Sequence, residues 1–158
     1  MERRRQRGFS LIELLIVVAI IGIIAAIAIP NLLKSQQAAR ETAAIKELQT
    51  VRDSEVMYSI TKGHHKFTDL ATLGSQGIID SALASGTKGG YNFAATPIES
   101  EGPSMFDATA KPSSVGAFGT GNRSYYTNEG MVVYEADGGT PPSSTPQDRI
   151  PKDGQPIQ

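Results

Sequence analysis

The chain has 158 residues, of which 15 are Lys or Arg and 16 are Asp or Glu. This nearly balanced charge gives no support for a nucleic-acid-binding surface. Cysteine is absent, so no disulfide can stabilise a folded domain, even in an oxidising compartment. The length suffices for a long apolar helix followed by one small domain of roughly 100 residues.

A basic leader and a long apolar run make up the first 33 residues. Four Arg stand against one Glu in residues 1–7, Gly8 follows, and the apolar run begins at Phe9. Glu13 stands near the start of this run, and residues 14–33 contain no charge. About 20 uncharged, mostly apolar residues can cross a bilayer as a helix, whereas a carboxylate beside such a span is costly. We therefore expect a membrane-spanning helix over residues 9–33 and a partner for Glu13.

The stretch RGFSLIELLIV at residues 7–17 resembles the N-terminal signature of type IV prepilins and pseudopilins. In that family a membrane peptidase cuts after the glycine, the new N-terminal residue is methylated, and mature subunits assemble through their N-terminal helices. The resemblance implies a leader peptide at residues 1–8, cleavage between Gly8 and Phe9, and an N-methylated Phe9. Glu13 then corresponds to the acidic residue at the fifth mature position of the family.

A structural function without enzymatic activity or cofactor follows from this resemblance. We expect a subunit of a type IV pilus, in which the Phe9 amine and Glu13 neutralise one another between subunits and apolar helices pack in the core. Gly22 and Pro30 lie where many family members carry a helix-weakening glycine and proline. The implied partners are the prepilin peptidase/methyltransferase, an inner-membrane assembly platform, minor pilins and copies of the chain itself in a helical filament. The chain would begin in the inner membrane and end in an extracellular filament.

Other interpretations of the same residues remain. The major pseudopilin of a type II secretion system, in a periplasmic pseudopilus, is the alternative within the family. An ordinary secretory signal peptide would use the A-x-A motif at residues 26–28, but the apolar run is long for one and Glu13 lies at its entrance. An uncut single-span anchor carrying a binding or enzymatic domain is a further class.

Residues 31–60 continue the helix in a different environment. Ala44, Ile45, Leu48 and Val51 recur on one helical stripe, whereas the charged residues fall largely off it. The sequence therefore predicts one helix over residues 9–60, apolar all round in its first half and amphipathic in its second, with a stop at Gly63.

The region from residue 63 to residue 137 predicts short helical turns and then strands. Thr68 or Asp69 could cap a turn, Asp80 another, and Ile78-Ile79 could fill a core. Strands are predicted over residues 90–95, 105–110, 123–127 and 131–136, with a hairpin turn at residues 128–130. The expected fold is α+β: a long N-terminal helix packed on a small antiparallel sheet of about four strands, with a soluble globular domain over residues 34–137.

The last 21 residues, 138–158, contain five of the nine prolines and little apolar bulk. They are expected to form an extended surface tail or to be disordered. Because cysteine is absent, the chain departs from the many pilins of this family that close a C-terminal loop with a disulfide. It is most similar to a type IV pilin without that bond.

Other candidate sites each have a simpler explanation. His64-His65 lacks further metal ligands, and residues 137–140 with Asp148 lack the carboxylate density of a calcium loop such as that of the major pseudopilin. We therefore expect no metal site. Thr140 and the Ser-Thr run at residues 143–145 could accept O-linked sugar but suffice as a soluble spacer. The aromatic residues are too far apart along the helix for electron conduction.

Overall fold

The computed structural model describes residues 9–99 and 102–157. The chain divides into two compact units between Ser35 and Gln36, and each is described by itself. Helix α1, Leu11–Thr61, runs without interruption from the first unit into the second. The predicted single long helix is thereby confirmed, and its ends differ from the expected ones by only one or two residues.

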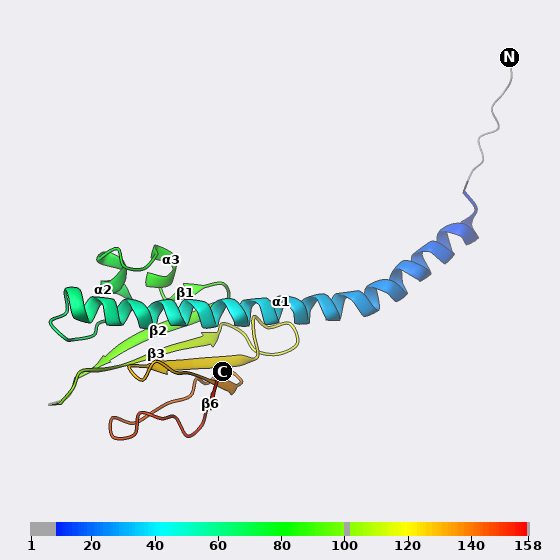
Figure 1. Cartoon of the computed structure of the whole chain (residues 1–158). Coiled ribbons are helices and arrows are strands. Elements are labelled where there is room, and N and C mark those ends of the chain that lie inside the picture. Colours follow the sequence, from blue (N-terminus) through cyan, green and yellow to red (C-terminus); the bar gives the residue numbers. More distant parts are fainter. Residues whose placement is uncertain (1–8, 100–101, 158) are drawn as a thin grey trace, which may run out of the picture. The chain divides into compact units, whose positions relative to one another are not determined.

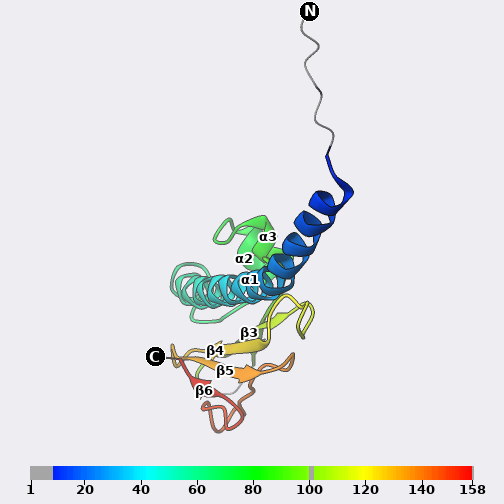
Figure 2. The same cartoon turned by 90° about the vertical axis from the view of Figure 1, so that its right-hand side faces the viewer.

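The second unit contains an antiparallel sheet against one side of α1, as Figures 1 and 2 show. The strand order is β1-β2-β3-β4-β5-β6, so neighbours in the sequence are neighbours in the sheet. The strands are β1 (Thr87–Lys88), β2 (Tyr91–Ile98), β3 (Met105–Pro112), β4 (Arg123–Asn128), β5 (Val133–Asp137) and β6 (Gln155–Pro156). The α+β fold is confirmed, with six strands in place of about four. The four predicted strands are β2 to β5, because β1 and β6 are too short to show an alternating pattern.

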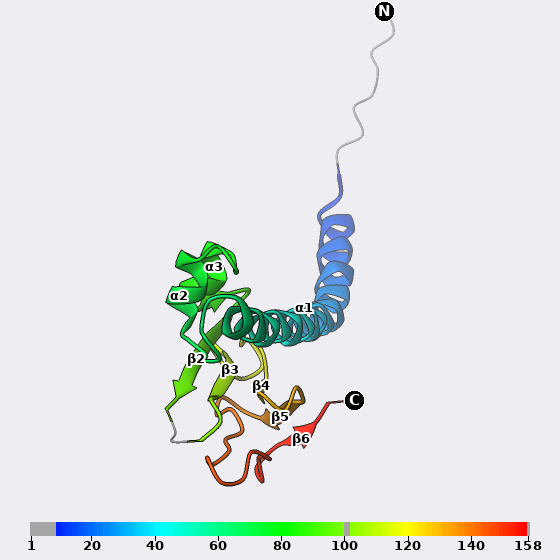
Figure 3. The same cartoon turned by 60° about the vertical axis from the view of Figure 1, so that its left-hand side comes forward.

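Two short helices follow α1 and lie beside its second half (Figure 3). Helix α2, Leu70–Ser75, begins after Asp69, whose side chain accepts a hydrogen bond from the Thr72 amide at 2.8 Å. Helix α3, Ser81–Ala84, begins after Asp80, which accepts bonds from two amides of the first turn. Of the two residues proposed for the first cap, Asp69 is the one used.

The core lies between α1, the short helices and the inner face of the sheet. From α1 it takes the predicted stripe, with Leu48 and Val51 fully buried. From β3 it takes Phe106 and the small residues Ala108 and Ala110, all fully buried, which confirms the predicted inward face of that strand. Aromatic and aliphatic residues from β2, β4 and the short helices complete the core: Leu70, Leu73, Ile79, Leu83, Tyr91, Phe93 and Tyr125.

Residues 138–157 follow an ordered path on the second unit. Strand β6 pairs with β5, and the amide of Ile157 donates to the carbonyl of Val133 at 2.9 Å. Pro142 and Pro151 are buried. A segment with little apolar bulk is thus fastened by backbone pairing, by packed prolines and by the polar contacts described below.

Candidate functional site

The N-terminus of α1 is closed by one half of a capping box. The Glu13 side chain reaches back and its Oε2 accepts the amide of Ser10 at 2.9 Å. A carboxylate in the first turn also complements the positive end of the helix dipole. The Ser-x-x-Glu spacing is a known signature of this motif, and the sequence analysis did not use it. Glu13 therefore has an intramolecular role in the single subunit, whatever it does between subunits.

The apolar part of α1 is uncovered. None of its most apolar 18-residue window is buried within the chain. Exposed side chains include Phe9, Leu11, Ile12, Leu14, Leu15, Ile16, Val18, Ile20, Ile21, Ile23, Ile24, Ile27 and Ile29. Such a surface is unfavourable in water, so the segment needs lipid or other protein chains around it.

Gly22 and Pro30 both lie within unbroken helix. Pro30 lacks an amide hydrogen, so the carbonyl four residues earlier loses its helical partner without ending the helix. A methyl group at Gly22 would meet nothing within 4 Å, so no contact within the subunit requires glycine there. Gly8 and the leader lie outside the described residues, and cleavage, methylation and the Phe9–Glu13 pair stay predictions.

A second set of residues fastens α1 to the sheet. Arg123 on β4 donates to Glu41 Oε2 through Nη2 at 2.8 Å and Nε at 3.1 Å, and its Nη1 donates to Glu135 at 2.9 Å. Glu41 is nearly fully buried, and its other oxygen accepts the amide of Asn122 at 2.8 Å. The hydrogen bond with Glu41 raises the pKa of Arg123 above its ordinary value. This pair, which we call the helix–sheet clamp, joins residues 82 positions apart in the sequence.

Glu55, about four turns beyond Glu41 on α1, is fully buried. Its Oε2 accepts the amide of Thr68 at 3.0 Å, and no partner for Oε1 is found in the described part of the chain. Burial raises the pKa of Glu55 to about 7, opposed by the bond from Thr68 and assisted by the charge of Asp69. Glu41 and Glu55 were expected off the buried stripe, yet the series 41, 44, 48, 51, 55 follows the heptad-like spacing of one face.

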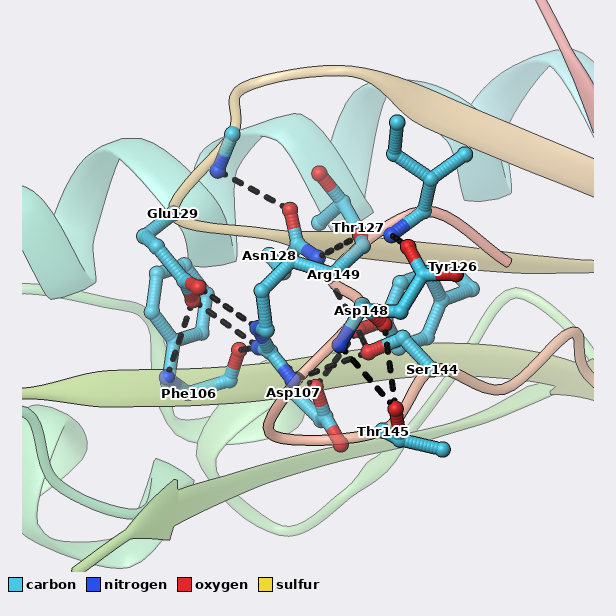
Figure 4. Close-up of polar contacts among 12 residues, drawn as sticks. Phe106, Asp107, Tyr126, Thr127, Asn128, Glu129, Ser144, Thr145, Asp148 and Arg149 are labelled. Carbon is cyan, nitrogen blue, oxygen red and sulfur yellow. Dashed lines mark hydrogen bonds and ion pairs between the residues drawn. The ribbon is translucent and has the colours of Figure 1, made fainter. Parts of the chain in front are cut away.

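The C-terminal segment is fixed by one arginine, as the close-up in Figure 4 shows. Arg149 donates to both oxygens of Glu129, at 2.6 and 2.9 Å, and to Asp107 at 2.8 Å. It also donates to the Phe106 carbonyl at 2.7 Å and to Ser144 at 2.8 Å. A guanidinium is planar and has five N–H donors in fixed directions, so one arginine can bind several acceptors at once. We call this group the Arg149 cluster.

Neighbouring polar groups extend the Arg149 cluster. The Tyr126 hydroxyl bonds to Asp107 and, at 2.6 Å, to Ser144, while the Asn128 amide group donates to the Arg149 carbonyl at 2.7 Å. Burial raises the pKa of Glu129, but the hydrogen bonds from Arg149 and from the backbone amides of Glu129 and Phe106, together with the charge of Arg149, bring this pKa below its ordinary value. The hydrogen bond with Glu129 raises the pKa of Arg149. The charged pair of Glu129 and Arg149 is thus stabilised, and the cluster ties the tail to β3, β4 and the turn that follows β4.

The candidate metal ligands do not gather. Across residues 9–99 and 102–157, no three His, Asp or Glu side chains are grouped to hold a metal ion. Asp148 instead stabilises its own turn, in which its amide donates to Thr145 Oγ1 at 3.0 Å and its carboxylate accepts the Ile150 amide at 3.2 Å. His64 and His65 both have positive φ, 48° and 66°, in the turn after α1. Gly63, the predicted stop, belongs to the same turn, where its amide donates to the Tyr58 carbonyl at 2.7 Å.

Comparison with known families identifies the N-terminal segment. Residues 3–29 match the family model described as the prokaryotic N-terminal methylation motif. The prepilin-type resemblance, inferred from residues 7–17, is confirmed by this match. No solved structure shows significant similarity to the chain.

Several curated proteins are similar to part of the chain. The type IV major pilin protein PilA of Myxococcus xanthus is 57% identical over 53 residues, 32% of this chain and 24% of that protein. The type IV wide pilus major component PilA4 of Thermus thermophilus is 40% identical over 70 residues, 44% of this chain and 53% of that protein. The type II secretion system core protein G of Aeromonas hydrophila is 30% identical over 69 residues, 44% of this chain and 48% of that protein. The chain therefore spans about half or less of the length of these relatives.

Proposed function

We propose that this chain, whose N-terminal segment is that of the type IV prepilin and pseudopilin family, is a structural subunit of a type IV pilus. The observation that carries the proposal is an apolar helix beginning in a methylation motif and left wholly uncovered by its own chain. In a monomer in water such a helix exposes its apolar side chains, whereas in a bundle of copies these side chains are buried. The similarity of about a third of the chain, 32%, to the type IV major pilin of Myxococcus xanthus supports the same function.

Assembly follows from the chemistry of the N-terminus. Cleavage between Gly8 and Phe9 frees an amine at the end of an apolar helix. In the dry core of a filament this cation and the Glu13 carboxylate of another copy are each costly alone and compensate each other as a pair. The pair favours one axial register, while apolar packing along α1 supplies non-directional attraction.

Processing and localisation are part of the proposal. The prepilin peptidase/methyltransferase cuts the leader and methylates Phe9, and the subunit waits in the inner membrane with residues 9–33 in the bilayer. An assembly platform and minor pilins then transfer it into an extracellular filament. The basic leader, with its excess of Arg, holds the N-terminus on the cytoplasmic side before cleavage.

A second function is favoured by the relatives named core protein G of type II secretion systems. In that case the same N-terminal chemistry would build a periplasmic pseudopilus. We prefer the pilus because the tail is held by the side-chain cation of Arg149, which bonds to Glu129 and Asp107. Both functions are structural, and neither requires an active site.

One experiment tests the proposal. Cells expressing the chain are sheared, the released material is sedimented, and the protein is identified and its N-terminus determined by mass spectrometry. We expect sedimenting fibres that contain the chain beginning at methylated Phe9. Substitution of Gly8 by leucine is the matched control, since it should leave uncut precursor in the membrane and no chain in the fibres. Mature protein starting near Pro30, or no chain in sheared material, would contradict the proposal.

A further inference from the structure

An exposed aromatic residue stands on a rigid loop beside the helix–sheet clamp. The loop between β3 and β4 comprises residues 113–122, and its first nine residues, 113–121, have the sequence SSVGAFGTG without a charged residue. Phe118 is 86% exposed and Val115 is 51% exposed. Both are large apolar side chains on one short loop that the described part of the chain leaves uncovered. We call residues 113–121 the Phe118 loop.

Hydrogen bonds within the loop hold its shape. The amide of Gly119 donates to the Gly116 carbonyl at 2.9 Å, and the amide of Thr120 donates to the Ser114 carbonyl at 2.8 Å. Ser114 and Thr120 are also joined through their side chains. A Cβ at Gly119 would lie 2.5 Å from the Ser114 carbonyl oxygen, so only glycine fits this turn. The exposure of Phe118 is thus a property of a defined conformation.

Helix α1 fixes the position of this loop. The Gln37 side-chain amide donates to the carbonyls of Gly116 and Gly119 at 2.8 and 3.0 Å, and its oxygen accepts from Asn122 at 3.2 Å. Gln37 is itself buried. A loop ordered in advance loses little conformational entropy on binding, which is the usual requirement of a preformed docking surface. An aromatic residue at its tip is typical of the residues that dominate interface energies.

The position of Gln37 along α1 indicates what covers the loop. Residues 11–33 precede it on the same helix and, at 1.5 Å per residue, extend for about 35 Å. In a bundle of copies staggered along its axis, the apolar segment of one chain lies against the second unit of a neighbouring chain. That segment is uncovered in its own chain. An uncharged loop adds no unpaired charge to such a contact.

We propose that the Phe118 loop is a docking surface for the apolar helical segment, residues 14–33, of a second copy of this chain. This inference rests on the proposed function, because the second copy is the neighbouring subunit of the fibre. Phe118 and Val115 pack on the leucine and isoleucine side chains of that segment. The contact adds a specific apolar anchor, held by Gln37, to the non-directional packing between helices.

Cysteine crosslinking tests the docking directly, because the chain contains no cysteine of its own. Phe118→Cys is combined with a second cysteine placed in turn at each position from 14 to 33, and fibres are oxidised. We expect crosslinked chains at positions three or four residues apart, on one helical face. Ile150→Cys, at another exposed apolar position, is the matched partner control and should crosslink with none of them. Phe118→Cys alone controls for crosslinks between two loops.

A separate experiment tests whether the loop contacts lipid instead. Because the chain lacks tryptophan, the fluorescence of a single introduced tryptophan reports on its own position. Phe118→Trp and Ile150→Trp are placed as full chains in phosphatidylcholine and phosphatidylglycerol vesicles containing brominated acyl chains. We expect equal, weak quenching at both positions, and strong quenching confined to Phe118→Trp would overturn the docking in favour of a membrane contact. Wild-type fibres whose Phe118→Cys variants give no crosslink would overturn this inference alone. Absence of the wild-type chain from sheared fibres would overturn the proposed function and the docking together.

Discussion

The two units of this chain place apolar and polar side chains in opposite ways. In the first, leucine and isoleucine side chains are exposed around the whole helix, and Glu13, the only carboxylate among the described residues of this unit, caps its end. In the second, the same helix buries Gln37, Glu41 and Glu55, each with a specific partner from another element. Burial of polar groups is tolerated there because hydrogen bonds replace those lost to water.

This contrast distinguishes side chains that are buried within the chain itself from side chains that can be covered only by other molecules. Among the described residues, the buried side-chain polar atoms of the second unit have hydrogen-bond partners within the chain except Glu55 Oε1 and the Tyr125 hydroxyl, and the Arg149 cluster holds the tail. The first unit has no tertiary partner within the described residues, so its environment must come from lipid or from further copies. Variants in the first unit should therefore change assembly with little effect on folding, and variants in the second should change folding first.

The largest expected effect concerns Glu13, which has two separable roles. Glu13→Gln keeps an oxygen that can accept the Ser10 amide but removes the charge, whereas Glu13→Ala removes both. If the charge pairs with the Phe9 amine of a neighbour, both variants should be cleaved and inserted yet largely absent from sheared fibres. Loss of the cap alone costs about 0.5–2 kcal/mol of helix stability. The measurement is the ratio of chain in fibres to mature chain in membranes.

Normal fibre yield from Glu13→Gln together with poor yield from Glu13→Ala would assign the requirement to the cap and refute the charge pair. Both variants should retain the unfolding transition of the wild-type chain in detergent, because Glu13 contacts nothing in the second unit among the described residues. If either variant unfolded at a lower temperature than the wild-type chain, Glu13 would also contribute to the stability of the second unit, and the two units would not be independent.

The next effect concerns Arg149 and should appear in folding. Arg149→Met leaves Glu129 and Asp107 without their cation, and their side chains retain only 26% and 29% exposure. We expect a loss of about 2–3 kcal/mol in the free energy of unfolding, below the range for fully buried pairs since some solvent reaches these carboxylates. Urea unfolding of the full chain in mild detergent measures it. Lys152→Met is the matched control, because its side chain is 88% exposed and its contact with Asp148 is 3.7 Å long.

Faster proteolysis of residues 138–157 should accompany the loss in Arg149→Met. Arg149→Lys should be intermediate, because an ammonium keeps the charge but not the fork that binds both Glu129 oxygens. Equal stability of Arg149→Met and Lys152→Met would show that β6 and the buried prolines hold the tail without the cluster.

The sequence predicted features that depend on neighbouring residues and missed those that depend on distant ones. The long helix, the caps at Asp69 and Asp80 and the strands β2 to β5 all follow from local periodicity or capping chemistry. The helix–sheet clamp joins Glu41 to Arg123, and the Arg149 cluster joins Arg149 to Asp107, over 82 and 42 positions. No local pattern indicates which of many charged residues will meet at such separations.

The candidate site follows the same division. Gly8, Phe9 and Glu13 were identified because the prepilin motif is contiguous, and the family match supports the motif without testing the role of each residue. The capping contact between Ser10 and Glu13 was equally local and could have been predicted from the Ser-x-x-Glu spacing. The Phe118 loop could not, because Gln37 and residues 116–119 meet only in the folded unit.

A smaller effect concerns Glu55 and pH. Its folded-state pKa of about 7 lies above the ordinary value of 4.5, so the folded chain binds more protons than the unfolded chain between these values. Stability should therefore fall as pH rises through this window, by at most about 3 kcal/mol. Glu55→Gln removes this dependence. The difference in free energy of unfolding between the wild-type chain and Glu55→Gln, measured from pH 4 to pH 8, isolates it from other carboxylates.

Asp53→Asn, at an exposed carboxylate of the same helix, is the matched control for this measurement. Its unfolding curve should follow that of the wild-type chain across the range. A difference between the wild-type chain and Glu55→Gln that stays constant from pH 4 to pH 8 would show that Glu55 does not titrate with folding in this window.

The smallest effect concerns Gly22, and it bears on how the first unit behaves under load. Glycine is the weakest helix former of this segment apart from Pro30, and alanine should stabilise the helix by about 0.5–1 kcal/mol. A methyl group fits there without a clash within the chain.

In lipid or detergent the wild-type segment stays helical, since unpaired backbone groups are costly there. In a fibre we expect local melting between Gly22 and Pro30, where neighbouring copies can satisfy or shield the freed groups. Melting lengthens the chain from about 1.5 towards 3.3 Å per residue, so the fibre would extend without losing contacts. Gly22→Ala fibres should therefore show helical density further into this segment by electron microscopy and extend less under force, and unbroken helical density from Phe9 to Tyr58 in wild-type fibres would refute the melting.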